Sequence, residues 1–411
     1  MEFKNVNEAI AIIENRHDWT KGKVALNRFN EYIQYKKNPQ YGLKCIHITG
    51  TNGKGSTSKA LQVILTEAGY KVGSFNSPNM ISRMDGICID GKPILEKDYL
   101  SYVNAYFEEW EEFDLSIFEV ETFLSFQYFL DQSVDLAIYE VGMGGKDDAT
   151  NVIDSMISCV TNIGLDHCSF LGDTYSKIAY TKGGIIKKDS LFITNEKRED
   201  CLEVFRKICK EKHTKFIKNT YIPTNIVVDS CLHFDTGTYL DLKVPTIARY
   251  QSTNISFAIG ILEALKEKKL INYSKEDVYK GLLNFYWAGR FEVIRKDPLV
   301  ILDGAHNKEG IDTLIDSLKG ISDLSVIFSA LKDKPYEYML DRLCEVSKDI
   351  VVCEFDFYRA EKAEKLAGYK EVKVIKDFKE AICIKMKENH PLLICGSLYF
   401  IRQVKEFLKE K

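Results

Sequence analysis

A glycine-rich turn joins an apolar run to a helix near the start of this chain, and this order constrains the fold more than any other feature. Residues 45–49 read Cys-Ile-His-Ile-Thr, and residues 50–57 read Gly-Thr-Asn-Gly-Lys-Gly-Ser-Thr. Glycines permit the tight turn and let backbone N–H groups face phosphate oxygens. The positive end of the following helix favours the same anion. The segment therefore predicts a phosphate-binding loop on an α/β sheet.

The spacing within this loop differs from the usual P-loop, G-x-x-x-x-G-K-[ST]. Only three positions run from Gly50 to Gly53, and Gly55 separates Lys54 from the hydroxyl of Ser56. Lys54 supplies a mobile charge for the β- and γ-phosphates. A turn of this composition could also be a purely structural connection. The strand before it and the helix after it favour phosphate binding.

Composition excludes several classes of protein. The 411 residues carry a formal net charge of −4, too balanced to indicate a nucleic acid or a membrane surface as partner. No apolar run is long enough to span a bilayer, and residues 1–19 resemble an amphipathic helix, not a secretory signal. The eleven cysteines include no C-x-x-C pair. We therefore expect a cytoplasmic protein without a disulfide framework or a cysteine-bound metal.

Apolar runs alternate with helical patterns along most of the chain, which is typical of parallel α/β sheets. We expect an N-terminal domain at 1–295, a P-loop-type ATPase fold with a mostly parallel sheet, and a smaller Rossmann-like α/β domain at 296–411. Expected strands are 45–49, 136–139, 157–161, 191–194, 299–302, 325–328, 349–353, 371–375 and 391–395. Expected helices include 56–69, 117–130 and 252–268. Residues 215–245 show short alternating runs and indicate a small antiparallel elaboration.

Several expected strands deliver polar residues to their carboxyl ends, where open α/β sheets hold ligands. Glu140 follows one such strand, and a carboxylate beside a phosphate loop suits Mg²⁺; the alternative is a helix-capping or solvent-facing glutamate. Asp166 and His167 follow another strand, which favours metal or phosphate contact over a structural histidine. Lys182 precedes two glycines, and the local sequence by itself predicts an exposed lysine near the end of a helix. Asp303 could belong to a functional site or to a simple turn.

Ordered motifs from about residue 20 to the C-terminus resemble one family, the folylpolyglutamate synthase/dihydrofolate synthase branch of the Mur ligase superfamily. Beside the 45–57 segment stand Asn-Pro-Gln (38–40), Glu-Val-Gly-Met-Gly-Gly-Lys-Asp-Asp-Ala-Thr-Asn-Val-Ile (140–153), Asn-Ile-Gly-Leu-Asp-His (162–167), Leu-Gly-Asp-Thr (171–174) and Lys-Gly-Gly-Ile-Ile-Lys (182–187). Ala-Gly-Arg-Phe-Glu (288–292), Asp-Gly-Ala-His-Asn (303–307), Leu-Lys-Asp-Lys (331–334) and Gly-Ser-Leu-Tyr (396–399) complete the series.

This resemblance implies an ATP-dependent, ADP-forming amide ligase. In the family, the γ-phosphoryl group of ATP passes to a substrate carboxylate, and the amine of L-glutamate then attacks the acyl phosphate. The acceptor would be a folate or dihydropteroate, and the enzyme would be a monomer without nucleic-acid or membrane partners. Positioned Mg²⁺ and cations would carry most of the catalysis, because the reaction needs charge neutralisation more than covalent help.

The resemblance also implies roles for individual residues. ATP contacts would be Asn52, Gly53, Lys54, Gly55, Ser56, Asn254, Arg290 and Asp303, with Arg290 near the γ-phosphate. Mg²⁺ ligands would be Ser77, Glu140 and His167. Lys182 matches the lysine that the family carbamylates, which would support a second Mg²⁺. His306 and Ser397 would face the glutamate across the cleft between the domains. Pterin contacts would come from Leu26 to Phe29, Phe118, Glu119, Thr122, Asp147, Asp148 and Ala149.

Three departures from the family pattern lie mainly on the folate side. The usual Ser-Pro-His-Leu…Glu-Arg-Ile loop here reads Ser-Pro-Asn-Met…Asp-Gly-Ile, at 77–80 and 85–87. Lys146 stands where an arginine is usual, and Tyr250-Gln251 replaces His-Gln. The ATP apparatus is intact, so the acceptor is less determined than the chemistry.

Two other readings stay open at this stage. One is a ligase of the same superfamily with a different carboxylate acceptor. The other is a nucleotide switch or ATPase that acts on a protein partner. A GTPase of that kind needs Asn-Lys-x-Asp, and the Asn-Lys at 307–308 continues with Glu-Gly. The sequence leaves undetermined the preferred folate, the glutamate chain length and whether the enzyme is bifunctional.

Overall fold

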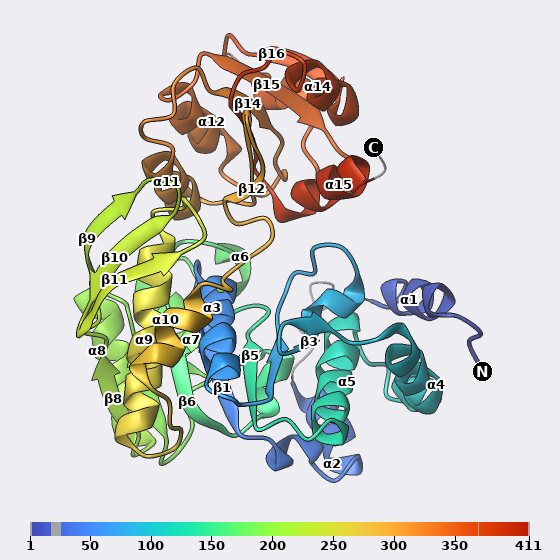
Figure 1. Cartoon of the computed structure of the whole chain (residues 1–411). Helices are drawn as coiled ribbons and strands as arrows, with labels where there is room; N and C mark the ends of the chain where they lie inside the picture. The colour runs from blue at the N-terminus through green and yellow to red at the C-terminus, as the bar shows by residue number, and fades with distance from the viewer. Residues whose placement is uncertain (1, 18–25, 369, 410–411) are drawn as a thin grey trace. The chain divides into compact units, whose positions relative to one another are not determined.

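The computed structural model of the chain describes residues 2–17, 26–368 and 370–409 (Figure 1). The chain divides into two compact units, of which the first comprises Met1–Ile222 and Asn254–Leu282. The second comprises Pro223–Thr253 and Leu283–Lys411, so it receives a segment from the middle of the chain. Residues 18 and 19 of the expected N-terminal helix, and the start of the family-like motifs near residue 20, lie outside the described residues. The helix α1 (Val6–Glu14) occupies part of the expected range.

The N-terminal unit is built on an eight-stranded sheet with the order β4-β3-β2-β5-β1-β6-β7-β8. The strands are β1 (Cys45–Thr49), β2 (Val72–Phe75), β3 (Ile87–Ile89), β4 (Lys92–Pro93), β5 (Leu136–Glu140), β6 (Ser155–Val160), β7 (Leu191–Thr194) and β8 (Lys215–Lys218). The strands from β2 to β8 in this order run parallel, whereas β3 and β4 are antiparallel additions at one edge. All four strands predicted for this unit are present.

Two features of this sheet differ from the expectation. The strand β8 extends the large parallel sheet, so the antiparallel part of the expected 215–245 segment begins only at β9 (Pro223–Val228). The strand β2 was not expected, because its four residues include Gly73 and Ser74 and lack an extended β-branched run. Gly73 is required there, since a Cβ at this position would lie 2.9 Å from the Phe129 ring.

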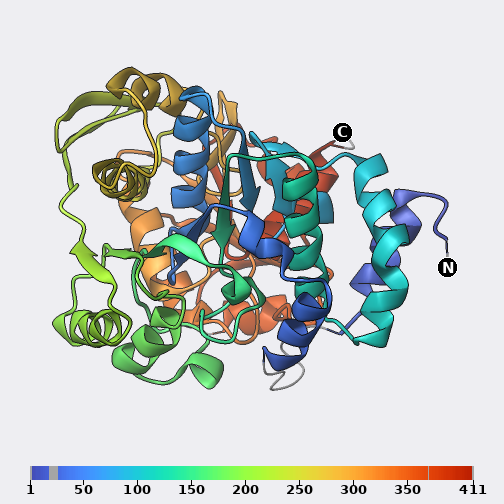
Figure 2. The ribbon, with the colours of Figure 1, turned by 90° about the horizontal axis from the view of Figure 1, so that it is seen from below.

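Helices cover both faces of the large sheet. Side chains of α1, α2 (Asn27–Tyr35), α4 (Glu96–Glu112) and α5 (Ile117–Asp131) form an aromatic core with one face. The helix α3 (Lys54–Glu67) contacts β1, β2 and β5 and packs against α10 (Lys275–Leu282). Figure 2 shows strands of the sheet between α3 (blue) and α5 (green). The remaining helices of this unit are α6 (Cys168–Leu171), α7 (Tyr175–Gly183), α8 (Glu199–Glu211) and most of α9 (Gln251–Glu267).

The C-terminal unit contains a six-stranded sheet with the order β12-β13-β17-β14-β15-β16. The strands are β12 (Glu292–Lys296), β13 (Leu299–Asp303), β14 (Ser325–Phe328), β15 (Asp349–Glu354), β16 (Lys373–Asp377) and β17 (Leu392–Cys395). Only β12 is antiparallel to its neighbour. Its helices are α11 (Lys308–Ser317), α12 (Tyr336–Cys344), α13 (Ala363–Ala367), α14 (Phe378–Lys385) and α15 (Leu398–Lys409). The predicted fold class, two α/β units with a mostly parallel first sheet, is confirmed.

The segment that enters the C-terminal unit from the middle of the chain forms a separate antiparallel sheet. It consists of β9, β10 (Leu232–Thr236) and β11 (Tyr239–Val244), in the order β11-β10-β9. After β11, Ala248 is fully buried in the core of the C-terminal unit, and Tyr250 packs against that core. The segment is therefore an integral part of this unit.

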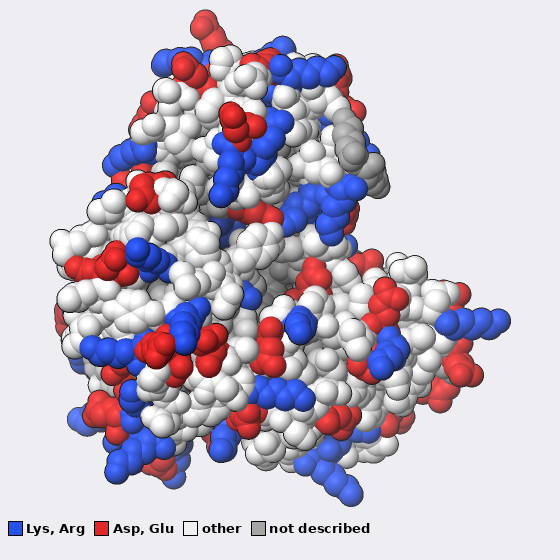
Figure 3. Space-filling model, viewed as in Figure 1, with Lys and Arg blue, Asp and Glu red and all other residues white. Residues whose placement is uncertain are grey.

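Charged side chains of both signs are interspersed on the face shown in Figure 3. This mixed pattern agrees with the small net charge of −4. Within the described ranges, no helix combines the length and the apolar character that a bilayer crossing requires.

Candidate active site

The loop after β1 leads directly into α3. Gly53 is the residue before the helix and has a left-handed backbone, with φ of 83°. The helix begins at Lys54, two residues earlier than expected, and its first turn contains the buried Gly55 and Ser56. A helix leaves the N–H groups of its first turn without partners inside the helix. These groups therefore provide donors for an anion at the carboxyl edge of the sheet.

Two residues directly after the neighbouring strand β6, Thr161 and Asn162, hold this loop by hydrogen bonds and are called the clamp residues below. The carbonyl oxygen of Asn52 accepts hydrogen bonds from Thr161 Oγ1 at 2.6 Å and Asn162 Nδ2 at 3.2 Å. The backbone N–H of Asn52 donates to Asn162 Oδ1 at 3.0 Å. Sequence reasoning missed both clamp residues, although their position directly after β6, at the same sheet edge as the loop, was an available signal.

Asn254 and Gly53, two of the expected ATP contacts, lie against each other. A Cβ on Gly53 would stand 2.4 Å from Asn254 Oδ1. Gly50 is equally constrained, because a Cβ there would stand 1.8 Å from Thr161 Oγ1. The loop thus needs glycine for close approach as well as for its backbone angles.

Two lysines from different elements converge on one carbonyl of the loop. Lys54 Nζ donates to the Gly50 oxygen at 3.1 Å, and Lys182 Nζ donates to the same oxygen at 2.9 Å. Lys182 comes from the last turn of α7. The structure therefore brings the expected phosphate-binding lysine and the expected carbamylated lysine together.

The expectation from sequence physics that Lys182 is an exposed lysine is wrong. Its side chain is only 4% exposed, because α7 directs it toward the glycine loop and not toward solvent. Burial, followed by the charge of Lys54, lowers the pKa of Lys182 to about 7. Asp166 and Asp148 oppose this shift. A substantial fraction of the Lys182 amine is therefore neutral near pH 7.

The three expected Mg²⁺ ligands follow strands of the same sheet edge. Glu140 is the last residue of β5, is 4% exposed and stands opposite Ile48 of β1. It is therefore neither a helix cap nor a solvent-facing glutamate. Ser77 follows β2 by two residues. His167 lies in the turn before α6 in a left-handed conformation, with its side chain 35% exposed and 3.9 Å from Asp166. A buried carboxylate and a hydroxyl at one edge of the sheet are oxygen donors of the kind that Mg²⁺ prefers.

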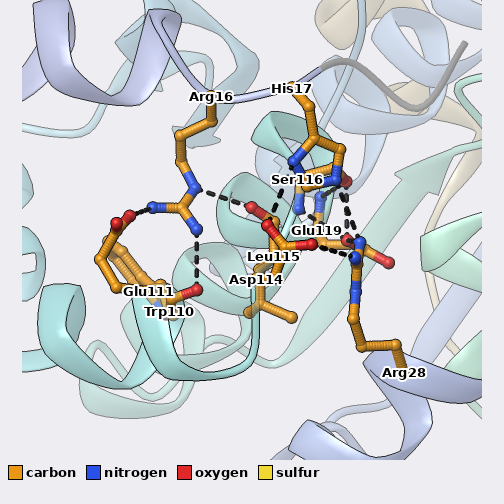
Figure 4. Close-up of polar contacts among 9 residues, drawn as sticks. All are labelled: Arg16, His17, Arg28, Trp110, Glu111, Asp114, Leu115, Ser116 and Glu119. Atoms are coloured by element: carbon orange, nitrogen blue, oxygen red, sulfur yellow. Dashed lines mark hydrogen bonds and ion pairs between the residues drawn. The ribbon is translucent and has the colours of Figure 1, made fainter. Parts of the chain in front are cut away.

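Two of the expected pterin contacts on α5 make internal hydrogen bonds. Glu119 accepts from Ser116 at the start of the helix and from Arg28 Nη2 at 2.9 Å, as Figure 4 shows. Thr122 is fully buried and donates to the Phe118 carbonyl at 2.7 Å. Phe118 itself is half-buried. Glu119 and Thr122 therefore stabilise the helix, while the Phe118 ring retains exposed surface.

The expected pterin contacts at 147–149 also include both buried residues and an exposed one. Asp148 is buried and accepts from Met143 N at 2.9 Å and from Thr150 N and Oγ1 at 3.0 and 2.5 Å. Burial raises its pKa. Ala149 is 3% exposed within the aromatic core, whereas Asp147 is exposed. Of these three, only Asp147 presents its side chain to solvent.

The segment that departs most from the family pattern is well ordered locally. Ser82 and Asp85 cap the short helix η3 (Arg83–Gly86) reciprocally. A Cβ on Gly86 would stand 2.3 Å from Asn79 Oδ1, so the small residue and the asparagine fit each other. Arg83 lies 3.3 Å from the buried Glu121. The family arginine is absent, yet this loop still carries a guanidinium.

The predicted site residues of the C-terminal unit gather around the end of β13. Asp303 is 3% exposed and accepts hydrogen bonds from Phe291 N and Ala305 N at 2.7 Å and from the Tyr250 hydroxyl at 3.0 Å. Burial raises the pKa of Asp303, although the charge of Arg290 opposes this. Sequence analysis noted Tyr250 only as a departure and missed this contact.

Arg290 and His306 lie next to the same turn. A Cβ on Gly304 would stand 2.8 Å from Arg290 Nη1, so glycine permits the guanidinium to approach. His306 Nδ1 lies 2.9 Å from the Gly304 carbonyl oxygen, so Nδ1 carries a proton and donates it to this carbonyl. Ser397 is 1% exposed at the start of α15. Arg290, His306 and Asp303 thus lie around the end of β13, and Ser397 follows the neighbouring strand β17 by two residues.

The arrangement of a glycine loop before α3 and a second Rossmann-like unit defines a Mur-type ligase. The family model of the Mur ligase middle domain matches residues 48–262, and that of the Mur ligase glutamate ligase domain matches residues 289–398. The dihydrofolate synthase/folylpolyglutamate synthase of Bacillus subtilis (strain 168) is 33% identical, over 96% of this chain and 99% of that protein. The chain therefore belongs to the folylpolyglutamate synthase/dihydrofolate synthase family of Mur ligases.

Solved structures agree over nearly the whole chain. A Mycobacterium tuberculosis folylpolyglutamate synthase complexed with ADP and AMPPCP has a TM-score of 0.89 at 25% identity, with 98% of each chain covered. An FPGS–AMPPCP–folate complex has a TM-score of 0.85 at 28% identity, covering 98% of this chain and 99% of that one. Both complexes contain an ATP analogue.

Proposed function

We propose that this chain is an ATP-dependent, ADP-forming ligase that joins the amine of L-glutamate to a carboxylate of a folate. The full-length family match, combined with an intact glycine loop at the head of α3, carries this assignment. The folate-containing relative supports the acceptor class, and the ligase domain match supports glutamate as the second substrate.

Charge neutralisation is the main task of the N-terminal unit. The N–H groups of residues 53–56 and the positive end of α3 bind the phosphates of ATP. Lys54 compensates the charge that develops during γ-phosphoryl transfer. The acceptor carboxylate oxygen attacks the γ-phosphorus, ADP leaves, and an acyl phosphate remains. The glutamate amine then attacks the acyl carbon, phosphate leaves, and the amine loses its proton.

We assign Mg²⁺ binding to Ser77, Glu140 and His167. Bound Mg²⁺ would neutralise phosphate oxygens and orient the γ-phosphoryl group. The neutral amine fraction of Lys182 supports carbamylation, since a neutral amine adds to CO₂, forms N–COO⁻ and releases a proton. The carbamate would turn a cation beside Lys54 into an anion able to support a second Mg²⁺.

Several of the expected pterin contacts already bond to other residues of the protein, so fewer of them are proposed to touch the substrate. Phe118 offers an aromatic face and Asp147 an exposed carboxylate, whereas Glu119, Thr122, Asp148 and Ala149 act as positioning residues. For the C-terminal unit, we propose His306 and Ser397 as glutamate contacts and Arg290 and Asp303 as nucleotide contacts. Asn254 would fix the loop that holds the nucleotide.

The test is product identification by mass spectrometry. Dihydropteroate and tetrahydrofolate are each supplied with ATP, Mg²⁺ and L-glutamate, and released ADP is measured in parallel. Glutamylation of tetrahydrofolate supports folylpolyglutamate synthesis, and glutamylation of both acceptors shows a bifunctional enzyme. If protein that binds ATP glutamylates neither at millimolar acceptor, the folate assignment is wrong and the alternative, a Mur-type ligase with another carboxylate acceptor, replaces it.

The altered segment 79–86 motivates a prediction on affinity. Loss of one charged hydrogen bond to a ligand costs about 1.5–3 kcal/mol. We therefore expect a KM for reduced folates roughly ten- to a hundredfold above that of relatives with the usual loop.

We further propose a cytoplasmic monomer. All eleven cysteines are free thiols, which suits a reducing compartment. Sedimentation of the purified protein tests the oligomeric state.

A further inference from the structure

Three side chains with metal-binding atoms meet where β9 turns into β10. His233 Nε2 lies 3.1 Å from Cys231 Sγ and 3.6 Å from Asp229 Oδ1. One ligand atom from each residue lies within 4.8 Å of the other two. Within the described part of the chain, this is the only such group of three or more His, Cys, Asp and Glu residues. It lies on the small antiparallel sheet, apart in sequence from every residue assigned to the ligase reaction.

The positions of the three residues follow from strand geometry. Cys231 directly precedes β10 and His233 is the second residue of that strand. Residues two apart in an extended chain point to the same side, and the contact between Cys231 Sγ and His233 Nε2 agrees with this. Asp229 is the first residue after β9, and its Oδ1 accepts the backbone N–H of Cys231 at 3.0 Å. The turn itself therefore holds the carboxylate beside the thiol.

A fourth residue orients the histidine. Asp241 Oδ1 of β11 lies 3.0 Å from His233 Nδ1, on the far side of the ring from Cys231. A carboxylate that accepts the Nδ1 proton fixes the tautomer and leaves the Nε2 lone pair directed at the thiol and at Asp229. This carboxylate–histidine arrangement is the usual outer support of a metal-bound imidazole.

The spacing of the three ligand atoms fits one tetrahedral ion. Zn²⁺ binds sulfur at about 2.3 Å and nitrogen or oxygen at about 2.0–2.2 Å, which places neighbouring ligand atoms about 3.3–3.6 Å apart. The 3.6 Å between His233 Nε2 and Asp229 Oδ1 lies at the upper end of this range, and the 3.1 Å between Cys231 Sγ and His233 Nε2 lies below it, so the thiol must shift by a few tenths of an ångström on binding. A thiolate in the set favours Zn²⁺ over Mg²⁺, which prefers oxygen ligands.

We propose that Asp229, Cys231 and His233 bind a Zn²⁺ ion that fastens the β9–β10 turn. Water fills the fourth position, since Asp229 is 60% exposed and no further protein ligand belongs to the group. Binding removes the thiol proton, which passes to solvent. The site would revise the expectation from sequence that no cysteine binds metal.

Cobalt provides a direct test on the untagged full-length protein. Co²⁺ at this site should give a thiolate-to-metal charge-transfer band in the near ultraviolet and tetrahedral d–d bands in the visible region. One equivalent of Zn²⁺ should abolish both. An oxygen-rich Mg²⁺ site has no thiolate and cannot produce the charge-transfer band, so the two sites are distinguished.

Variants complete the test. Cys231→Ser should abolish the charge-transfer band, and His233→Ala should weaken Zn²⁺ binding at least tenfold. Asp241→Asn should weaken it ten- to a hundredfold while keeping the band, as expected for an orienting residue. Cys344→Ser, a half-buried cysteine elsewhere in this unit, is the matched control and should change nothing. Circular dichroism verifies that each variant is folded.

Two results would overturn the proposal. One is folded wild-type protein that shows no charge-transfer band with Co²⁺ and takes up no Zn²⁺ at micromolar concentration. The other is a band that persists in Cys231→Ser. Neither result bears on the ligase assignment, because product formation from folate and glutamate is measured separately.

Discussion

At the scale of single residues, the proposed active site of the N-terminal unit contains two amines that share one acceptor. Lys54 and Lys182 both donate to the Gly50 carbonyl, at 3.1 and 2.9 Å. Burial, followed by the charge of Lys54, lowers the pKa of Lys182. This difference in environment agrees with the two roles proposed above, a phosphate-directed cation for Lys54 and carbamylation for Lys182.

Lys54→Ala should lose ligase activity while the fold stays intact. Removal of one preorganised cation costs about 3 kcal/mol or more of transition-state stabilisation, which is at least a hundredfold in kcat. Lys188→Ala, which removes a 75% exposed lysine of the same unit, is the control. Steady-state rates and urea unfolding of both variants give the measurement. Near-wild-type turnover by folded Lys54→Ala protein would contradict the phosphate-loop assignment.

Lys182→Ala should be inactive, and small carboxylates such as formate should restore part of the rate. The physical reason is that the vacated space can accept an anion in place of the carbamate. Removal of CO₂ from the wild-type enzyme should also lower activity, and bicarbonate should restore it. Mass spectrometry that finds no CO₂ adduct, together with full activity after CO₂ removal, would exclude Lys182 from this role.

At the scale of elements, the turn between β1 and α3 depends on glycine for two separable reasons. Gly53 and Gly69 both have left-handed backbones, with φ of 83° and 88°. Only Gly53 meets a neighbour, because nothing lies within 4 Å of a Cβ on Gly69. Substitution of Gly69 therefore tests backbone strain alone, whereas substitution of Gly53 tests strain together with steric crowding.

Gly69→Ala should cost about 1–2 kcal/mol of stability and leave ATP affinity unchanged, since it adds only left-handed strain. Gly53→Ala should show the same strain and, in addition, a large loss of ATP affinity, because its Cβ displaces Asn254. Isothermal titration with ATP and urea unfolding measure the two effects. Equal ATP affinity in the two variants would show that the contact with Asn254 does not shape the loop.

The start of β15 is tied to the end of α14 by an ion pair. Lys385, only 4% exposed, donates to both carboxylate oxygens of Asp349 at 2.6 Å. Burial opposes ionisation of Asp349, but the Lys385 and Ser325 hydrogen bonds hold its pKa below the ordinary value. A depressed carboxyl pKa stabilises the fold above the unfolded pKa, and this contribution disappears as pH falls through the folded pKa.

Lys385→Met should therefore destabilise the protein by about 1–2 kcal/mol at pH 7, less than for a fully buried pair because the Asp349 carboxylate is 47% exposed. The difference from wild type should shrink below about pH 4, where Asp349 takes up a proton. Lys387→Met, which alters an exposed lysine two residues further along the chain, is the control. Urea unfolding from pH 3 to 7 measures the effect, and a pH-independent difference would contradict the assignment.

At the scale of the whole molecule, the C-terminal unit is discontinuous in sequence. Residues 223–253 lie in sequence between the two parts of the N-terminal unit, yet they belong to the C-terminal unit and contribute Ala248 and Tyr250 to its core. The hydroxyl of Tyr250 reaches Asp303 at the end of β13. The stability of this unit thus depends on Ala248 and Tyr250, which precede Glu292, the first residue of its main sheet, by more than forty residues.

Tyr250→Phe should lower the stability of the C-terminal unit by about 1 kcal/mol, because Asp303 loses one of its hydrogen bonds while the ring packing remains. Tyr358→Phe, which alters a 72% exposed tyrosine of the same unit, should have no effect. Hydrogen exchange of β13 and β17 amides measures the change. If only amides of the large N-terminal sheet respond, the segment has been assigned to the wrong unit.

The sequence by itself determined the parallel α/β class, most strand positions and the glycine loop, because buried strands and phosphate loops depend on local composition and periodicity. It did not predict β2, whose four residues carry little strand preference and are placed by neighbouring strands and by Phe129.

Only the tertiary structure decided what distant residues do together. Burial of Lys182 against Gly50 depends on the packing of α7 against the loop, which no local pattern encodes. The same holds for the contact of Arg28 with Glu119 and for Asp303, which Tyr250 reaches from the middle of the chain. The hydrogen bonds between Ser116 and Glu119 are different, because they form a local capping box at the start of α5. The environment of Lys182 and Asp303 arises from contacts between segments far apart in sequence. Their charge state and accessibility therefore depend on the fold and cannot be read from the sequence motifs that contain them.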